Sequence, residues 1–270
     1  MYRSKAFYVC CAVTVCGVIL VYGTLFQADA IQRREDANVY ISASDGSGIE
    51  EASERILEEI GIPDMLQQMF GNFGAFTVAV FACVFVIGEY GNGVVKNIVG
   101  KGYARWQIFV AKYTAAIAAG VALMILTAAV TVITGGIVQR IADVPQIWDA
   151  AFIKELLCYS CVELLLGAAV TGIIVTISEL CRNFAVGISV SIGLIGFSTL
   201  LTSGIDLVVK RLFPQSQIRT ADYWLVDLMT ECPTQGIERQ LVVHVLWVCA
   251  VWSVLAVGTG ILHFKRADIQ

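Results

Sequence analysis

Six long apolar runs separate shorter polar segments along this chain. They cover roughly residues 6–26, 71–88, 113–138, 152–178, 184–204 and 241–262. A helix needs about 20 mainly apolar residues to cross the hydrocarbon core of a bilayer. Backbone polar groups in lipid must pair within their own segment, so runs of this length predict helices. The pattern predicts an all-α, polytopic membrane protein whose six transmembrane helices form a single domain over residues 1–270.

The composition agrees with this pattern. Hydrophobic residues make up 57% of the 270 positions and charged residues 15%, with a mean hydropathy of +0.76. A soluble domain has about half apolar and about a quarter charged residues. The net charge is −4 and no long basic stretch is present, which excludes a nucleic-acid partner.

The first apolar run resembles a signal peptide in its flanks. Arg3 and Lys5 precede it, and Ala28-Asp29-Ala30 follows it like a cleavage site. The apolar core of a signal peptide has about 7–15 residues, however, and this run is longer. We therefore expect a retained first helix.

Lys and Arg residues set the expected orientation. With the N terminus inside, the inside segments carry Lys and Arg at about twice the density of the outside segments. Positive residues favour the cytoplasmic side, above all in short loops. Both termini are thus predicted to be cytoplasmic, with residues 27–70 and 205–240 outside.

The two outside segments differ in character. Residues 27–70 are rich in Asp and Glu, and Ser47-Gly48-Ile49-Glu50 fits a helix capping box. This loop is interpreted as a solvated acidic cap, with a cation-collecting site as the alternative. Residues 205–240 contain two amphipathic pieces, one ending before Pro214 and one around Tyr223, which we expect to lie at the outer interface or dip into it.

No catalytic motif is present. The nearest approach to a phosphate-binding loop, Gly93 to Lys101, has the wrong spacing and is followed by Gly102 in place of Ser or Thr. Cys158 and Cys161 are spaced as CxxC but lie in an apolar run, so plain packing is favoured over a metal or redox role. The chain is not expected to be an enzyme, and no cofactor or metal is predicted on it.

Glu163 is a carboxylate inside the fourth apolar run. A charged residue there costs on the order of 3 kcal/mol in insertion assays and usually faces a partner or a cavity. Glu163 is either a weak candidate for a substrate or proton path, or a protonated or locally bonded structural residue. Small residues four apart, such as Ala168 with Gly172 and Ser189 with Gly193, favour close helix packing in a bundle or a dimer.

The cytoplasmic loop 88–112 is longer than a chain reversal requires. It holds a short amphipathic stretch, Val94 to Val99, between glycines, and Arg105 then opens the next helix. Such a helix under the bilayer suits either docking to a soluble partner or lying on lipid headgroups.

This loop resembles that of ABC exporter permeases of the type-2 (ABC-2) class, especially small bacterial six-span subunits of antibiotic-peptide export and immunity systems. An acidic residue ending the second span, glycines, a Lys-Asn pair, an Arg and a Lys entering the third span form the shared pattern. The matching residues here are Glu89, Gly91 or Gly93, Lys96 with Asn97, Gly102, Arg105 and Lys112, and Lys101 is expected to take part in coupling with them. Ala104 departs from the family, which has Ser or Thr there.

The resemblance implies a mechanism. Two permeases, identical or different, would sit on two copies of a separate subunit that binds ATP and Mg. Residues 90–102 would be a coupling helix, with Glu89 and Arg105 anchoring its ends. The chain would be a multi-pass protein of the bacterial cell membrane that exports a hydrophobic or amphipathic molecule, such as a peptide antibiotic or a lipid. The alternatives are a proton-linked secondary transporter using Glu163, and a non-transporting membrane sensor or immunity protein.

Overall fold

The computed structural model describes residues 2–42, 61–91, 98, 100–142, 148–213, 219–234 and 237–266. These residues form helices and contain no strand. The elements are α1 (Tyr2–Ser42), α3 (Ile62–Gln68), the π-helical segment η1 (Met69–Gly74), α4 (Ala75–Gly91), α6 (Arg105–Ile141), α7 (Ala150–Cys181), α8 (Phe184–Gly196), α9 (Ser198–Leu212), the 3-10 turn η2 (Thr220–Tyr223), α10 (Leu225–Glu231) and α11 (Arg239–Arg266).

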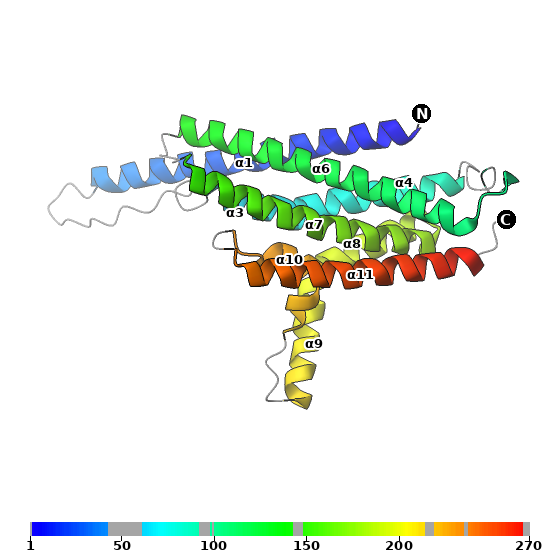
Figure 1. Ribbon diagram of the computed structural model, residues 1–270. Coiled ribbons are helices and arrows are strands. Elements are labelled where there is room, and N and C mark those ends of the chain that lie inside the picture. Colours follow the sequence, from blue (N-terminus) through cyan, green and yellow to red (C-terminus); the bar gives the residue numbers. More distant parts are fainter. Residues whose placement is uncertain are drawn as a thin grey trace.

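The long helices lie side by side in an elongated bundle (Figure 1). Five segments of the described chain are long and apolar enough to cross a membrane: Lys5–Ile31, Ile62–Tyr90, Arg105–Ile141, Ala150–Cys181 and Arg239–Phe264. The pair α8 and α9 makes a sixth if the two bent helices count as one span. The all-helical class is therefore confirmed, with five or six helices that are long and apolar enough to span a membrane.

The run predicted as one span over 184–204 is not a single straight helix. It breaks at Phe197, and α8 and α9 meet at 58°. Two features explain the break: glycine, a poor helix former, ends α8 at Gly196, and the carboxylate of Asp227 binds the hydroxyls of Ser198 and Thr202 at the start of α9. The predicted end of this span and the amphipathic piece after it belong to one helix, α9.

The outer loop predicted over 27–70 is partly helical. The first helix continues to Ser42, and the second candidate span already begins at Ile62. The first turn of α3 contains Pro63, and the backbone N–H of Gly61 donates to the Asp64 carboxylate at 3.2 Å. Residues 43–60, with the predicted capping box, lie outside the described residues.

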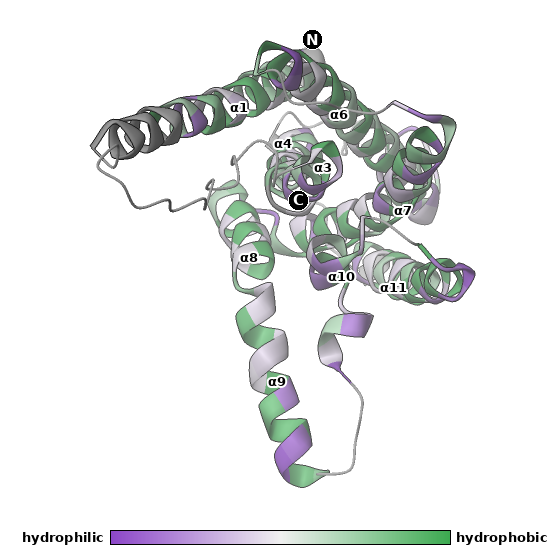
Figure 2. Ribbon diagram, turned by 90° about the vertical axis from the view of Figure 1, so that its left-hand side faces the viewer, coloured by the Kyte–Doolittle hydropathy of each residue, from purple (hydrophilic) through white to green (hydrophobic). Residues whose placement is uncertain are grey.

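The core lies around α4 and α7. Seen along the bundle, α4 is surrounded by α1, α6, α7 and α8 (Figure 2). Tight packing between α6 and α7 depends on glycine: a Cβ at Gly172 would overlap the ring of Tyr113, and one at Gly120 would lie 2.8 Å from the hydroxyl of Thr171. Small residues thus let these backbones approach, as expected for packed membrane helices.

The two ends of the bundle are named after the position of the first and last helices. The start of α1 and the end of α11 lie at the same end of the bundle (Figure 1). This end is called the terminal end below, and the other is called the distal end.

Candidate functional site

A buried ion cluster lies at the terminal end of the bundle. The ammonium group of Lys112, near the start of α6, lies 3.1 Å from Glu89 near the end of α4 and 2.9 Å from Glu179 near the end of α7. The three side chains are 5%, 3% and 1% exposed. One cation therefore joins three helices through two carboxylates.

Aromatic groups and an arginine surround this cluster. The Tyr90 hydroxyl donates to Glu179, and the Lys112 ammonium lies 4.5 Å from the centre of the Tyr90 ring. Arg182 lies over the same ring at 5.5 Å, and Phe264 of α11 is 5.6 Å from the ammonium. The cluster thus reaches the last helix as well.

Arg182 owes its position to the way in which α7 ends. It adopts a left-handed conformation with φ 49, and it is the one non-glycine residue with positive φ in the described chain. This conformation costs about 1 kcal/mol or more for a residue with a Cβ. The turn at Arg182 directly follows Cys181, the last residue of α7, and leaves the guanidinium over Tyr90, beside the buried charges.

A buried charge cluster of this kind is sensitive to the loss of one member. Buried ion pairs add little net stability, because desolvating both partners offsets their attraction. Removal of one partner, however, leaves an uncompensated buried charge and costs about 3–5 kcal/mol. The cluster can therefore hold the terminal ends of α4, α6 and α7 in one arrangement.

The residues predicted to couple the chain to a partner are placed as follows. Glu89 is buried in the ion cluster, and Gly91 is the last residue of α4. Lys101 and Gly102 form an exposed turn before α6, in which Gly102 has φ 87, a conformation that favours glycine. Arg105 is the first residue of α6. Gly93, Lys96 and Asn97 lie outside the described residues.

A pocket opens beside the cluster. Its volume is about 660 Å³, and it lies between α4, α6 and the turn before α6. Lys112 and Glu89 line its inner part, while Lys101 and Tyr103 line the part formed by the turn. The buried charges are therefore adjacent to the segment predicted to contact a partner.

Glu163 does not belong to this cluster. It lies near the middle of α7 and is fully buried. Neither of its carboxylate oxygens makes a hydrogen bond of normal geometry within the described part of the chain, and the same holds for the hydroxyl of Tyr159 one turn away. Phe70 of η1 packs against Tyr159, with 6.4 Å between the ring centres.

The short helix α10 packs against α7, and Cys232, directly after it, lies near Glu163. Gln67 of α3 donates to the carbonyls of Thr230 at 2.7 Å and Cys232 at 2.9 Å, so it holds the end of α10. Cys232, expected in a polar loop, is 3% exposed. Burial, together with smaller effects of the nearby Glu163 and Cys158, raises the pKa of its thiol to about 12.

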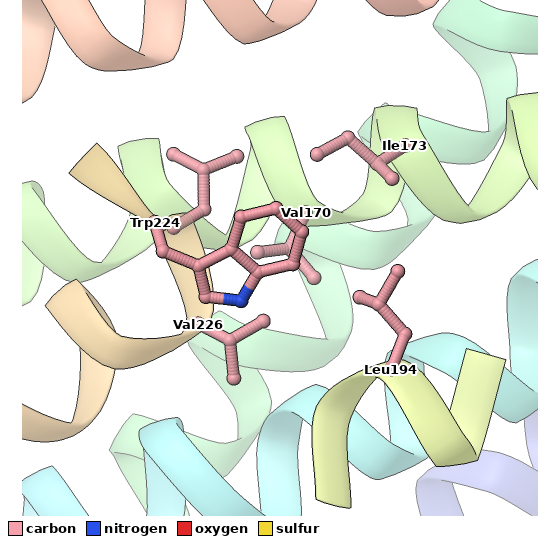
Figure 3. A pocket seen from close by; sticks show the side chains of 6 residues that line it. Val170, Ile173, Leu194, Trp224 and Val226 are labelled. Atoms are coloured by element: carbon pink, nitrogen blue, oxygen red, sulfur yellow. The ribbon is translucent and has the colours of Figure 1, made fainter. Parts of the chain in front are cut away.

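The start of α10 packs against both α7 and α8. The Trp224 indole lies among Val170, Ile173, Leu194 and Val226 (Figure 3). The gap that remains has a volume of about 10 Å³ and is lined almost entirely by apolar atoms. It is at most large enough for one water molecule, so it is a packing defect and not a ligand site.

Sequence reasoning missed Glu179, Tyr90 and Arg182 as members of the cluster. A signal for Glu179 existed, since Glu89, Lys112 and Glu179 all follow or open apolar runs on the side predicted to be inside. Helices of similar length place such residues at one end of a bundle, where opposite charges pair. The aromatic and arginine contacts depend on how α7 ends, and no pattern in the sequence indicates them.

The described residues contain no group of side chains that could hold a metal ion. In the described ranges, no three His, Cys, Asp or Glu side chains come together as a metal site would require. Comparisons of the chain with protein-family models, with curated proteins and with solved structures found no match.

Proposed function

We propose that this chain is the membrane-spanning permease subunit of an ATP-binding-cassette exporter of the type-2 class. In this account, a separate ATPase subunit docks at the terminal end, which faces the cytoplasm. Two permeases form the pathway for a hydrophobic or amphipathic substrate. The chain itself carries no nucleotide.

The observation that carries this proposal is the position of Glu89. It is buried against Lys112, and it comes directly before the segment 90–102 that resembles a coupling helix. Lys112 also binds Glu179, so a displacement at the end of α4 acts on α6 and α7. A push on the segment from a closing ATPase would thus be transmitted to three helices.

In this account, the ion cluster switches between two arrangements. A buried cation between two carboxylates can keep one partner while the other moves away, and desolvation penalises intermediate arrangements. Packed helices and buried charges respond to a push by shifting between discrete arrangements. Arg105, at the start of α6, is the second anchor in this account.

The test measures ATP hydrolysis and transport in reconstituted vesicles that contain the chain and its ATPase. Glu89→Gln keeps the size of the side chain but removes the charge that holds Lys112. We expect assembly to persist, hydrolysis to continue and transport per ATP to fall at least tenfold. Normal transport per ATP in this variant contradicts the assignment.

Glu179→Gln is the matched control. It removes the other carboxylate of Lys112, which is on α7 and not on the helix that continues into the coupling segment. A merely structural role predicts equal effects of the two variants on transport per ATP. The coupling role predicts a larger loss for Glu89→Gln at comparable thermal stability, and Glu155→Gln, exposed near the distal end, should match the wild type.

A proton-linked secondary transporter is the second candidate, and the burial of Glu163 favours it. A carboxyl group near mid-helix without a normal hydrogen bond is a place where a proton could bind and leave. This function predicts transport driven by a pH gradient without any ATPase, abolished in Glu163→Gln. The exporter account predicts no such transport.

A further inference from the structure

The helix α9 leaves the bundle sideways. It follows α8 at the 58° break and runs crosswise to the long helices (Figure 1). Viewed along the bundle, it projects away from all other long helices (Figure 2). Its 15 residues correspond to a length of about 22 Å.

The returning chain covers the polar side of α9. The hydroxyls of Ser198 and Thr202 donate to Asp227 of α10 at 2.8 and 2.5 Å. One turn further on, Asp206 accepts from the backbone N–H of Thr220 at 2.7 Å. Ser198, Thr202 and Asp206 are four residues apart and therefore share one face of the helix. This face is satisfied within the chain.

The side of α9 about a quarter turn away from this polar face is apolar and uncovered. Leu201, Ile205, Val208 and Leu212 follow the spacing of one helix face and are 55%, 49%, 57% and 67% exposed. Leu200 and Leu207 beside them are exposed even further. Contiguous apolar surface of this kind marks a membrane or protein contact in a folded chain.

Three observations indicate that lipid covers this face. Exposed apolar side chains are also found on α8, at Val186 and Val190, and at the break, at Phe197. A helix crosswise to membrane-spanning helices lies parallel to the bilayer plane. α8 is about 20 Å long, and α9 leaves the bundle on the distal side of its middle (Figure 1), which places α9 in the far half of a hydrocarbon core of about 30 Å.

The charges at the end of α9 fit the same environment. Lys210 and Arg211 are exposed and occupy its last turn. Long basic side chains at a membrane interface lay their stems along apolar surface and extend their charges to lipid phosphates. The helix therefore pairs an apolar face for acyl chains with a basic end for anionic headgroups.

We propose that α9 is a lipid-embedded arm in the leaflet on the distal side. Its Leu201–Leu212 face contacts acyl chains, and Lys210 and Arg211 bind the phosphates of anionic lipids. Asp227 holds the root of the arm to the bundle. This proposal is independent of the transport function.

The experiment places the photoreactive residue benzoylphenylalanine at Val208 in the full chain, reconstituted in vesicles of phosphatidylethanolamine and phosphatidylglycerol. Ser203, exposed on the polar side, receives the same residue as the matched control. After irradiation, mass spectrometry should find lipid adducts at 208 at least fivefold more often than at 203. Equal adduct yields at the two positions overturn the proposal.

A second occupant gives a different result. If a second copy of the chain covers the face, irradiation at 208 yields a cross-linked dimer in place of lipid adducts, and this also overturns the proposal. The headgroup contact is tested with Lys210→Gln/Arg211→Gln. This variant should lose at least half of the increase in melting temperature that phosphatidylglycerol gives over phosphatidylcholine, and an unchanged increase overturns this part.

Discussion

The ammonium group of Lys112 lies 2.9 Å from a carboxylate oxygen of Glu179, although the two residues are 67 positions apart in the chain. Both side chains are almost fully buried. This contact joins the start of α6 to the end of α7, and Glu89 adds the end of α4. The terminal end of the bundle is thus organised by charge, whereas the core between its ends is organised by apolar packing.

Removal of Lys112 should destabilise the protein strongly. Lys112→Met leaves Glu89 and Glu179 buried without their common cation, which costs about 3–5 kcal/mol. We expect a clear fall in the melting temperature of the purified protein in detergent. Lys154→Met, which changes an exposed lysine near the start of α7, is the control and should melt like the wild type. Equal melting of both variants would show that the cluster is not formed.

Glycine at position 172 should be needed for the contact between α6 and α7. In Gly172→Leu the new side chain meets the ring of Tyr113, and overpacking of a core costs about 1–3 kcal/mol. Gly193→Leu is the control, because nothing lies within 4 Å of a Cβ at that position. Thermal unfolding in detergent should separate the two variants. A Gly172→Leu protein as stable as Gly193→Leu argues against the close approach.

The root of α9 should depend on Asp227. Asp227→Ala removes the acceptor of the Ser198 and Thr202 hydroxyls, and an unsatisfied buried polar group costs about 1–3 kcal/mol. Hydrogen exchange should quicken at the start of α9 and in α10. Glu231→Ala breaks only the exposed pair with Arg219, worth about 1 kcal/mol or less, and should leave exchange in α9 unchanged. Unaltered exchange in both variants contradicts the anchoring role.

Cys232 should resist alkylation in the folded protein. With a pKa of about 12, only about one thiol in a thousand is ionised at pH 9, and burial blocks access as well. Peptide mapping after treatment with N-ethylmaleimide at pH 9 should find Cys232 unmodified, and modified once the chain is unfolded. Because the pKa is higher in the folded state, this group favours folding at lower pH, and its contribution falls as the pH rises above about 9. Rapid modification of the folded protein would place α10 outside the bundle.

The apolar runs were sufficient to predict the helical, membrane-spanning type of the fold, since long apolar segments have one stable form in lipid. The break at Phe197 was not predictable from hydropathy. It depends on a hydrogen bond between Ser198 and Asp227, which are 29 positions apart. The burial of Cys232 likewise follows from the docking of α10, held by Gln67 far away in the sequence.

The candidate site could be predicted only in part, because most of its contacts join residues that are far apart in the sequence. Glu89 could be singled out because an acidic residue ends an apolar run directly before a long glycine-containing loop. Its partners are set by the packing of four helices, which a local pattern does not encode. The Arg182 guanidinium, for example, lies over the ring of Tyr90 only because α7 ends in a left-handed turn at Arg182.

The most direct test of the central claim is affinity purification of this chain from its native membrane in mild detergent, with identification of the proteins that accompany it. The exporter account predicts a stoichiometric ATP-binding subunit that is lost when residues 90–102 are scrambled. A scrambled chain of unchanged melting temperature serves as proof of folding. A homo-oligomer without any ATPase contradicts the account and turns attention to Glu163.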